Sequence, residues 1–224
     1  MPRKRRPDAA GVPFHVLNRA AKRCVLFESA GDYGAFEQLL QEAAARHDVA
    51  IFSYCIMPNH WHFVLAPGRA GTLSRFMHWL TTTHARRWQN AHGLVGLGAV
   101  YQGRYKAIPI SSDHHFLWVC RYVERNPLRA ALADRAEAWR WSSLKLDRPS
   151  WLAAWPVARP PEWLSHVNAP HTMAELERIR HAVQRGIPFG SKDWQEQIMA
   201  TGQNVPSRPR GRPRRHPLAT VLNK

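Results

Sequence analysis

Two histidines separated by one residue are the part of the sequence best suited to chemistry. His60 and His62 follow the turn signal Pro58-Asn59 within a run of apolar residues. Alternate side chains of a β-strand share a face, so both imidazoles would project together while Trp61 takes the other face. Two neutral imidazoles on a rigid strand provide half of a divalent-metal site. The same spacing also fits two ordinary polar residues on the solvated face of a strand.

Acidic residues are absent from the segment that would build this site. No Asp or Glu occurs between Asp48 and Asp113. Nucleases that hold two metal ions use clusters of carboxylates, which this segment cannot provide. Neutral ligands would leave the charge of a single ion to act on a phosphate oxygen, helped by Arg104 and Lys106. We therefore predict phosphodiester activation, with a side chain as the nucleophile.

A later helix, predicted from Ser112 to about Asn126, carries a tyrosine outside its apolar face. Tyr122 lies roughly 110° from the centre of that face, at about 100° per residue, and Asn126 follows one turn later on the same side. The helix is predicted to stop there because Pro127 disfavours helical geometry in the residue before it. Taken alone, such a tyrosine is usually a boundary residue with a hydrated hydroxyl, and the amide is unremarkable.

The apolar periodicity along the chain predicts an α+β fold. The expected order is strand, helix, two strands in a hairpin, helix, strand and helix, which suits an antiparallel sheet with helices on one face. Asp32 is the expected cap of the first helix. The predicted strands are residues 12–17, 49–56, 60–66 and 106–110, and the predicted helices are residues 32–47, 72–88 and 112–126.

The segments outside this pattern differ in composition. Residues 147–170 are rich in Pro and Trp and should wrap over the domain as irregular chain, before one helix at 172–185. This part could be a small helical DNA-binding attachment or a packing appendage. The chain divides into a basic N-terminal arm, a main domain, a C-terminal extension and a basic tail, at residues 1–11, 12–146, 147–205 and 206–224.

The basic tail allows two interpretations. Arg208, Arg210, Arg212 and Arg214 alternate with Pro and Gly. This pattern resembles an AT-hook, an extended arm whose arginines enter narrow A·T-rich minor grooves. The simpler interpretation is a solvated basic tail.

Composition favours a folded protein with a polyanionic partner. Of the 224 residues 45% are hydrophobic, which permits a core, and the formal net charge is +16. This charge imbalance indicates a protein with a nucleic-acid partner rather than a merely soluble basic protein. The three cysteines, Cys24, Cys55 and Cys120, fit neither a disulfide framework nor a Cys-rich zinc site, and we expect small core residues. Without an apolar signal segment or a convincing membrane span, a cytoplasmic, nucleoid-associated protein is expected.

Three stretches, in this order, resemble the motifs of the single-tyrosine (HUH) transposases. The run Tyr54–His62 resembles the His-hydrophobe-His strand of that family, although Trp61 is larger than the usual hydrophobe. Tyr101–Lys106 resembles the segment after the long loop, and Arg121–Ala130 resembles the tyrosine helix. Within the family the chain is most similar to the REP-associated tyrosine transposases, which are tied to repetitive extragenic palindromes. The resemblance covers about residues 12–146.

The resemblance implies a ferredoxin-like fold that cleaves and rejoins single-stranded DNA near hairpins through a 5′-phosphotyrosine intermediate. His60 and His62 fall on the metal ligands of the family, and Tyr122 falls on its nucleophile. Asn126 occupies the place of a third polar ligand that is often Gln. The expected cofactor is Mg²⁺ or Mn²⁺, without a nucleotide, in a monomer or a homodimer. Basic residues beside the tyrosine, Arg125 and Arg129, would join Arg104 and Lys106 in contacting DNA.

Two other functions fit the same residues. A domesticated DNA-binding or regulatory protein of this fold could have lost catalysis, although the set of His60, His62 and Tyr122 is intact. An unrelated metal-dependent phosphoesterase with a small substrate fits the net charge of +16 less well. The other histidines in and around the predicted site are expected to be surface or packing residues, namely His78, His84, His92, His114 and His115.

Overall fold

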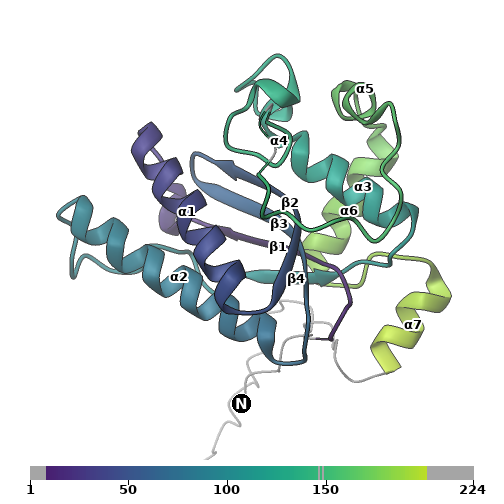
Figure 1. The fold of residues 1–224 in the computed structure, drawn as a ribbon, viewed down its shortest axis with the longest axis horizontal. Helices are drawn as coiled ribbons and strands as arrows, with labels where there is room; N and C mark the ends of the chain where they lie inside the picture. Colours follow the sequence, from purple (N-terminus) through teal and green to yellow (C-terminus); the bar gives the residue numbers. More distant parts are fainter. Residues whose placement is uncertain (1–8, 146, 148, 201–224) are drawn as a thin grey trace, which may run out of the picture.

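A four-stranded antiparallel sheet with the order β2-β3-β1-β4 is the centre of the fold (Figure 1). The computed structural model describes residues 9–145, 147 and 149–200. Each strand begins and ends within two residues of the positions predicted from the sequence. The strands are β1 (Phe14–Arg19), β2 (Val49–Met57), β3 (His60–Pro67) and β4 (Lys106–Pro109).

Helices α1 (Ala30–Arg46) and α2 (Thr72–Ala91) pack side by side on one face of the sheet, as predicted (Figure 1). Their apolar side chains meet Phe14, Trp61 and Phe63 in one buried cluster. The start of α1 differs from the prediction. Ser29 is the cap and Asp32 lies three residues later, where its carboxylate accepts hydrogen bonds from the Ser29 side chain and backbone in a capping box.

The opposite face of the sheet is also covered, and this corrects the prediction of helices on one face only. Helix α3 (His114–Glu124) and most of the C-terminal extension pack there (Figure 1). The reason lies in the strands themselves, because the side chains that face α3 are also apolar. Cys55, Met57, Val64 and Ile108 form a second buried cluster with Phe116 and Val119 of α3, among others. A strand that is apolar on both faces is stable only between two layers.

The ends of α3 also differ from the prediction. Its cap is Asp113 rather than Ser112, because the carboxylate of Asp113 accepts a hydrogen bond from the amide of His115. The helix ends at Glu124, and a separate turn, α4 (Asn126–Arg129), follows directly. Pro127 fits the first turn of α4, where its missing N–H would have no helical partner.

The C-terminal extension contains more helix than predicted. Besides the predicted helix α6 (Met173–Arg185), the structure has α5 (Trp163–Asn168) and α7 (Lys192–Ala200). Between α4 and α5, two tryptophans fix irregular chain to β2. Trp139 Nε1 donates to the carbonyl of Ile56 at 2.9 Å, and Trp155 Nε1 donates to that of Phe52 at 3.0 Å. Two short 3₁₀ turns complete the described elements, at Ala21–Arg23 and Ala136–Ala138.

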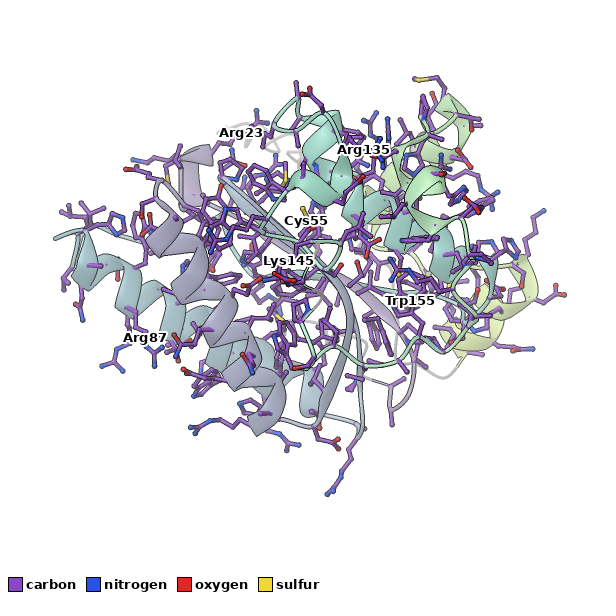
Figure 2. All side chains as sticks on the ribbon, turned by 45° about the horizontal axis from the view of Figure 1, so that its top comes forward. Arg23, Cys55, Arg87, Arg135, Lys145 and Trp155 are labelled. Atoms are coloured by element: carbon purple, nitrogen blue, oxygen red, sulfur yellow. The ribbon has the colours of Figure 1, made fainter. Side chains whose placement is uncertain are left out.

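The interior of the molecule is mainly apolar, although Arg121 and Glu124 are buried within it. Figure 2 shows Cys55 inside the molecule and Arg23, Arg87 and Arg135 at its edges. Of the three cysteines, Cys55 and Cys120 are buried, but Cys24 is exposed, contrary to the expectation of a core residue. Among the described residues no helix has the length and apolar character needed to cross a membrane. The basic arm up to residue 8 and the arginines of the tail lie outside the described residues.

Candidate active site

Strand β3 presents His60 and His62 on the sheet face that α3 covers. Trp61 and Phe63 point to the other face, into the cluster under α1 and α2, so the alternation predicted from the sequence is confirmed. The two imidazole centroids are 5.1 Å apart and the ring planes are at 80°. His62 is 4% exposed, whereas His60 at the start of the strand is partly exposed.

Each of these histidines uses its Nδ1 atom within the protein. His60 Nδ1 lies 2.7 Å from the side-chain oxygen of Asn59. His62 Nδ1 lies 2.9 Å from Nε2 of His15, a buried histidine of β1 whose ring stacks on it at 5.1 Å. These contacts leave the Nε2 atom of both rings for another ligand. We did not predict His15, although it lies in the strand predicted at residues 12–17, and adjacent antiparallel strands bring such positions together.

The three imidazoles are neutral near pH 7. Burial lowers the pKa of His60 to about 4, with a further effect of Arg19 and Arg129. Burial, His60 and His15 hold the pKa of His62 well below its usual range. Burial and then Arg129 lower the pKa of His15 to about 3. Two neutral imidazoles that share one face of the sheet, with ring centroids 5.1 Å apart, fit a divalent cation, because a metal ligand must bind through a free lone pair.

Tyr122 of α3 is brought to this pair from a distant part of the chain. Its ring centroid lies 6.0 Å from that of His62 and 5.8 Å from that of His15, edge-on to both. The side chain is only partly buried, in agreement with its predicted position outside the apolar face of the helix. The structure therefore gathers His60, His62 and Tyr122 at one place within a single chain.

Helix α3 is anchored to the sheet through a buried carboxylate. Glu124 accepts hydrogen bonds from Ser53 of β2 at 3.1 Å, from Ser143 at 2.7 Å and from Trp163 Nε1 at 2.7 Å. Burial raises the pKa of Glu124, and these three donors oppose the rise. A buried acceptor with three donors fixes the helix that carries Tyr122 against β2.

Two arginines anchor the same helix to the C-terminal extension. Arg121 is 4% exposed and donates to the carbonyls of His166, Ala169 and Pro170 at 2.8 to 3.0 Å. Arg125 Nη1 donates to the carbonyl of Val167 at 2.8 Å and also to that of Asn168. Arg125 was predicted to contact DNA, but in the structure its guanidinium holds the extension.

Arg129 and Asn126 surround the base of Tyr122. The Arg129 guanidinium carbon lies 3.9 Å from the Tyr122 ring centroid, and Nη1 donates to the Tyr122 carbonyl at 2.9 Å. The Asn126 amide nitrogen donates to the carbonyls of Tyr122 and Val123, at 3.2 and 3.1 Å. Its oxygen, the atom predicted to be a third metal ligand, accepts a hydrogen bond from Arg129 Nη2.

Two of the remaining predicted DNA contacts lie at the start of β4, where Lys106 pairs with Leu17 of β1, the residue that also pairs with His62. Arg104 is exposed and lines a pocket of about 290 Å³ beside α2, together with Met77 and Thr81. Lys106 is exposed and its Nζ donates to the carbonyl of Val183 in α6 at 3.0 Å. Arg208, Arg210, Arg212 and Arg214 fall outside the described residues.

His171 of the extension is a further residue that the sequence did not single out. It lies between α5 and α6, with its ring centroid 6.4 Å from that of Tyr122. Both of its ring nitrogens are buried without a hydrogen-bond partner among the described residues. Burial, followed by Arg121 and Arg129, lowers the pKa of His171 to about 4. No periodicity or motif indicates this residue, because its position depends on how the extension folds back.

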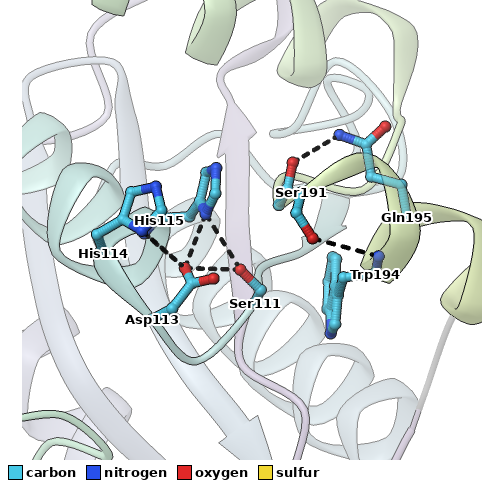
Figure 3. A network of polar contacts seen from close by, with 8 residues as sticks. Ser111, Asp113, His114, His115, Ser191, Trp194 and Gln195 are labelled. Atoms are coloured by element: carbon cyan, nitrogen blue, oxygen red, sulfur yellow. Dashed lines mark hydrogen bonds and ion pairs between the residues drawn. The ribbon is translucent and has the colours of Figure 1, made fainter.

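A second cluster of potential metal ligands lies at the start of α3. Ligand atoms of Asp113, His114 and His115 lie within 4.8 Å of one another, and Figure 3 shows the Asp113 carboxylate at their centre. The same Asp113 oxygen accepts hydrogen bonds from the Ser111 hydroxyl and the His115 amide, both at 2.7 Å. Burial raises the pKa of Asp113, but the hydrogen bonds from Ser111 and His115 outweigh it and lower the value. Helix capping accounts for this arrangement.

Comparisons with known proteins identify the fold and the family of the chain. One solved structure is described as a REP-associated tyrosine transposase bound to a REP hairpin. It is 18% identical, and the match covers 71% of this chain and 93% of that chain with a TM-score of 0.53. At this identity the likeness shows the fold alone. A Deinococcus radiodurans R1 protein described as a candidate transposase is 17% identical over 55% of this chain and 96% of that chain. Its TM-score of 0.39 supports no conclusion. No curated protein matches the chain.

The family model of the IS200-like transposases matches residues 9–126. This match includes the whole sheet, both histidines of β3, Tyr122 and Asn126. It spans more than half of the 224 residues. The chain belongs to the IS200-like transposases.

Proposed function

We propose that this protein cuts and rejoins single-stranded DNA beside hairpins through a covalent bond between DNA and Tyr122. The observation that carries the proposal is the position of Tyr122, whose ring lies 6.0 Å from that of His62 in the same chain. Sequence positions 62 and 122 are far apart, and α3 is held in place by Glu124 and Arg121 so that the two side chains meet.

His60 and His62 would hold Mg²⁺ or Mn²⁺ through their Nε2 atoms. Such an ion would act as a Lewis acid and draw negative charge from a non-bridging phosphate oxygen. With neutral ligands, the protein does not cancel the charge of the ion. The absence of carboxylates between Asp48 and Asp113 in the sequence is consistent with a single ion rather than a pair.

Tyr122 would attack phosphorus with its phenol oxygen. A bond forms between this oxygen and phosphorus, and the bond from phosphorus to the 3′ oxygen breaks. The phenol releases its proton to water, and the leaving 3′ oxygen takes up a proton from water. The products are a 5′-phosphotyrosine and a free 3′-hydroxyl. Because the new phosphodiester keeps the energy of the old one, the reverse reaction rejoins DNA without a nucleotide cofactor.

Two observations support DNA as the substrate. The net charge of +16 favours a polyanion, and this dependence on charge should make binding sensitive to salt. The neighbour of similar fold is described as bound to a REP hairpin, which suggests the same class of DNA for this chain. The exposed Arg104 and Lys106 and the arginines of the tail would bind phosphates or the minor groove.

The decisive experiment compares wild-type protein with Tyr122→Phe on labelled single-stranded hairpin DNA in Mn²⁺. We expect a denaturation-resistant protein–DNA adduct from the wild type and none from the variant, with mass spectrometry locating the link at Tyr122. Tyr33→Phe, on α1 across the sheet, is the matched control and should form the adduct.

Adduct formation by Tyr122→Phe would refute the assignment of Tyr122 as the nucleophile. Cleavage by the wild-type protein without any adduct would refute the covalent mechanism. Binding of hairpin DNA without cleavage or adduct, in Mg²⁺ as well as Mn²⁺, would instead establish the non-catalytic DNA-binding protein.

A further inference from the structure

His15 is a buried histidine that contacts the candidate metal ligand His62 from the neighbouring strand. In the register of β1 against β3, Leu17 pairs with His62, so His15 is the diagonal neighbour on the same face. His15 is 1% exposed, its ring stacks on that of His62 at an interplanar angle of 24°, and its Nε2 lies 2.9 Å from His62 Nδ1.

One proton lies between these two nitrogens, and its location decides what His62 can do. If His62 carries the proton on Nδ1, it donates to His15, and its own Nε2 keeps a free lone pair. If His15 carries the proton, His62 Nδ1 is the acceptor and a neutral His62 has its proton on Nε2. In that second state Nε2 cannot bind a metal ion.

The other histidine of the pair shows which state is expected. His60 Nδ1 lies 2.7 Å from the Asn59 side-chain oxygen, an atom that can only accept a hydrogen bond. His60 therefore has its proton on Nδ1 and its Nε2 lone pair free. For both histidines to bind one ion in the same way, His62 needs an acceptor at Nδ1, and His15 Nε2 occupies that place.

We propose that His15 is a positioning residue, which fixes the tautomer and the ring orientation of His62 so that Nε2 faces the metal. The inference rests on the proposed function, since it takes His62 as a metal ligand. Metal-binding histidines commonly donate their second ring N–H to a carboxylate or carbonyl, and the neutral imidazole of His15 would serve the same purpose. With its Nε2 in this hydrogen bond, His15 acts through His62 rather than on the ion.

The first test reads the tautomers without any metal. Two-bond ¹H–¹⁵N correlation spectra of the metal-free wild-type protein distinguish Nδ1–H from Nε2–H histidines, and the signals of His62 are assigned by comparison with His62→Gln. We expect His62 as the Nδ1–H tautomer. In His15→Leu, which removes the acceptor and fills the buried position with an apolar side chain, we expect the two tautomers of His62 to be mixed.

The second test measures Mn²⁺ binding by electron paramagnetic resonance. We expect His15→Leu to weaken binding by roughly 10- to 100-fold, the usual effect of losing a group that orients a ligand. His15→Gln offers an amide oxygen as acceptor and should restore most of the affinity. The control is His84→Gln, a buried histidine on the other face of the sheet whose Nδ1 lies 2.7 Å from the Tyr101 hydroxyl. It should bind Mn²⁺ like the wild type.

The two tests separate failure of His15 from failure of the metal site. An Nε2–H tautomer at His62 in the wild-type protein would refute the inference even where Mn²⁺ binds. Unchanged Mn²⁺ affinity in a folded His15→Leu variant would refute it as well. If His15→Leu does not fold, the inference is judged by the tautomer of His62 in the wild-type protein and by the Mn²⁺ affinity of His15→Gln. Wild-type protein that binds no Mn²⁺ would overturn the metal site of the proposed function and the inference with it.

Discussion

The guanidinium of Arg129 lies on the ring of Tyr122, with its carbon 3.9 Å from the ring centroid. The same side chain donates to the Tyr122 carbonyl and to the Asn126 oxygen. Burial lowers the pKa of Arg129, yet a guanidinium remains protonated at any ordinary pH. A partly buried cation therefore touches the candidate nucleophile, where the negative charge of a phosphate would arrive.

Replacing Arg129 should slow adduct formation more than it weakens DNA binding. We expect Arg129→Gln to lower the single-turnover rate by roughly 100-fold, the effect of removing one charged group that stabilises a transition state. Arg129→Lys keeps the charge but not the planar fork, so an intermediate rate is expected. The measurement is adduct formation at saturating DNA.

Arg86→Gln is the control for this series, because Arg86 is an exposed arginine of α2, which lies on the sheet face opposite to α3. It should leave the single-turnover rate unchanged. A rate for Arg129→Gln equal to that of Arg86→Gln would show that Arg129 only supports the end of α3.

Local pattern was sufficient for the sheet and for the two histidines of β3. Alternation around His60 and His62 depends on neighbouring residues only, so the face they share could be predicted and is confirmed. The same holds for Tyr122, whose angle from the apolar stripe of α3 is a local property. For these residues the period of the strand or helix converts the spacing in the sequence directly into the direction of the side chain.

The partners of these residues could not be predicted in the same way. The contact of His15 with His62, two residues 47 positions apart in sequence, depends on the register between β1 and β3. The position of His171 and the use of Arg125 depend on how the extension folds over α3. The apolar residues on both faces of β2 and β3 do indicate a second layer, but they do not reveal which segment of the chain will cover each face.

Asn126 remains a predicted third ligand, and its present hydrogen bond gives a way to test it. Its oxygen accepts from Arg129, so binding a metal requires that bond to open. If Asn126 is a ligand, Arg129→Gln should strengthen Mn²⁺ binding by releasing the oxygen, and Asn126→Ala should weaken it by roughly 10-fold. Titrations of both variants and of the double variant with Mn²⁺ measure these changes in affinity.

The double variant is decisive because loss of the Arg129 charge could by itself favour a cation. A ligand role predicts that the gain from Arg129→Gln largely disappears when residue 126 is Ala. An equal gain in both backgrounds would assign Asn126 to the capping of α3 alone. Loss of its hydrogen bonds to Tyr122 and Val123 should then cost only about 1 kcal/mol of stability.

The stability of the protein should decrease in mild acid, in part because of His84. Burial lowers the pKa of His84 to about 4 in the folded state, against an ordinary value of 6.5. The unfolded chain therefore binds the extra proton first as the pH falls below about 6.5, and the folded state loses stability until about pH 4. Between pH 7.5 and 5.5 this one group should cost about 1 kcal/mol.

Urea unfolding of the wild type and of His84→Gln at these two pH values measures the effect. Other buried histidines titrate in both proteins. The effect of His84 is therefore the difference between the wild type and the variant in the free energy of unfolding lost from pH 7.5 to 5.5. We expect the variant to lose about 1 kcal/mol less than the wild type over this range. Equal losses in the two proteins would show that protonation of His84 is not coupled to folding.

Tyr122 should act on the metal site of its own chain. The structure places its ring 6.0 Å from that of His62 within one chain, and Glu124 and Arg121 hold α3 there by hydrogen bonds. His60→Ala retains the tyrosine but lacks a ligand, whereas Tyr122→Phe retains the ligands but lacks the nucleophile. A mixture of the two, co-expressed and purified together, should therefore form no adduct with hairpin DNA. Wild-type protein co-expressed with each variant is the control and should remain active in proportion to its amount. Adduct formation by the mixture would require that α3 of one copy reaches the histidines of another, and the arrangement within one chain would then not be the working one.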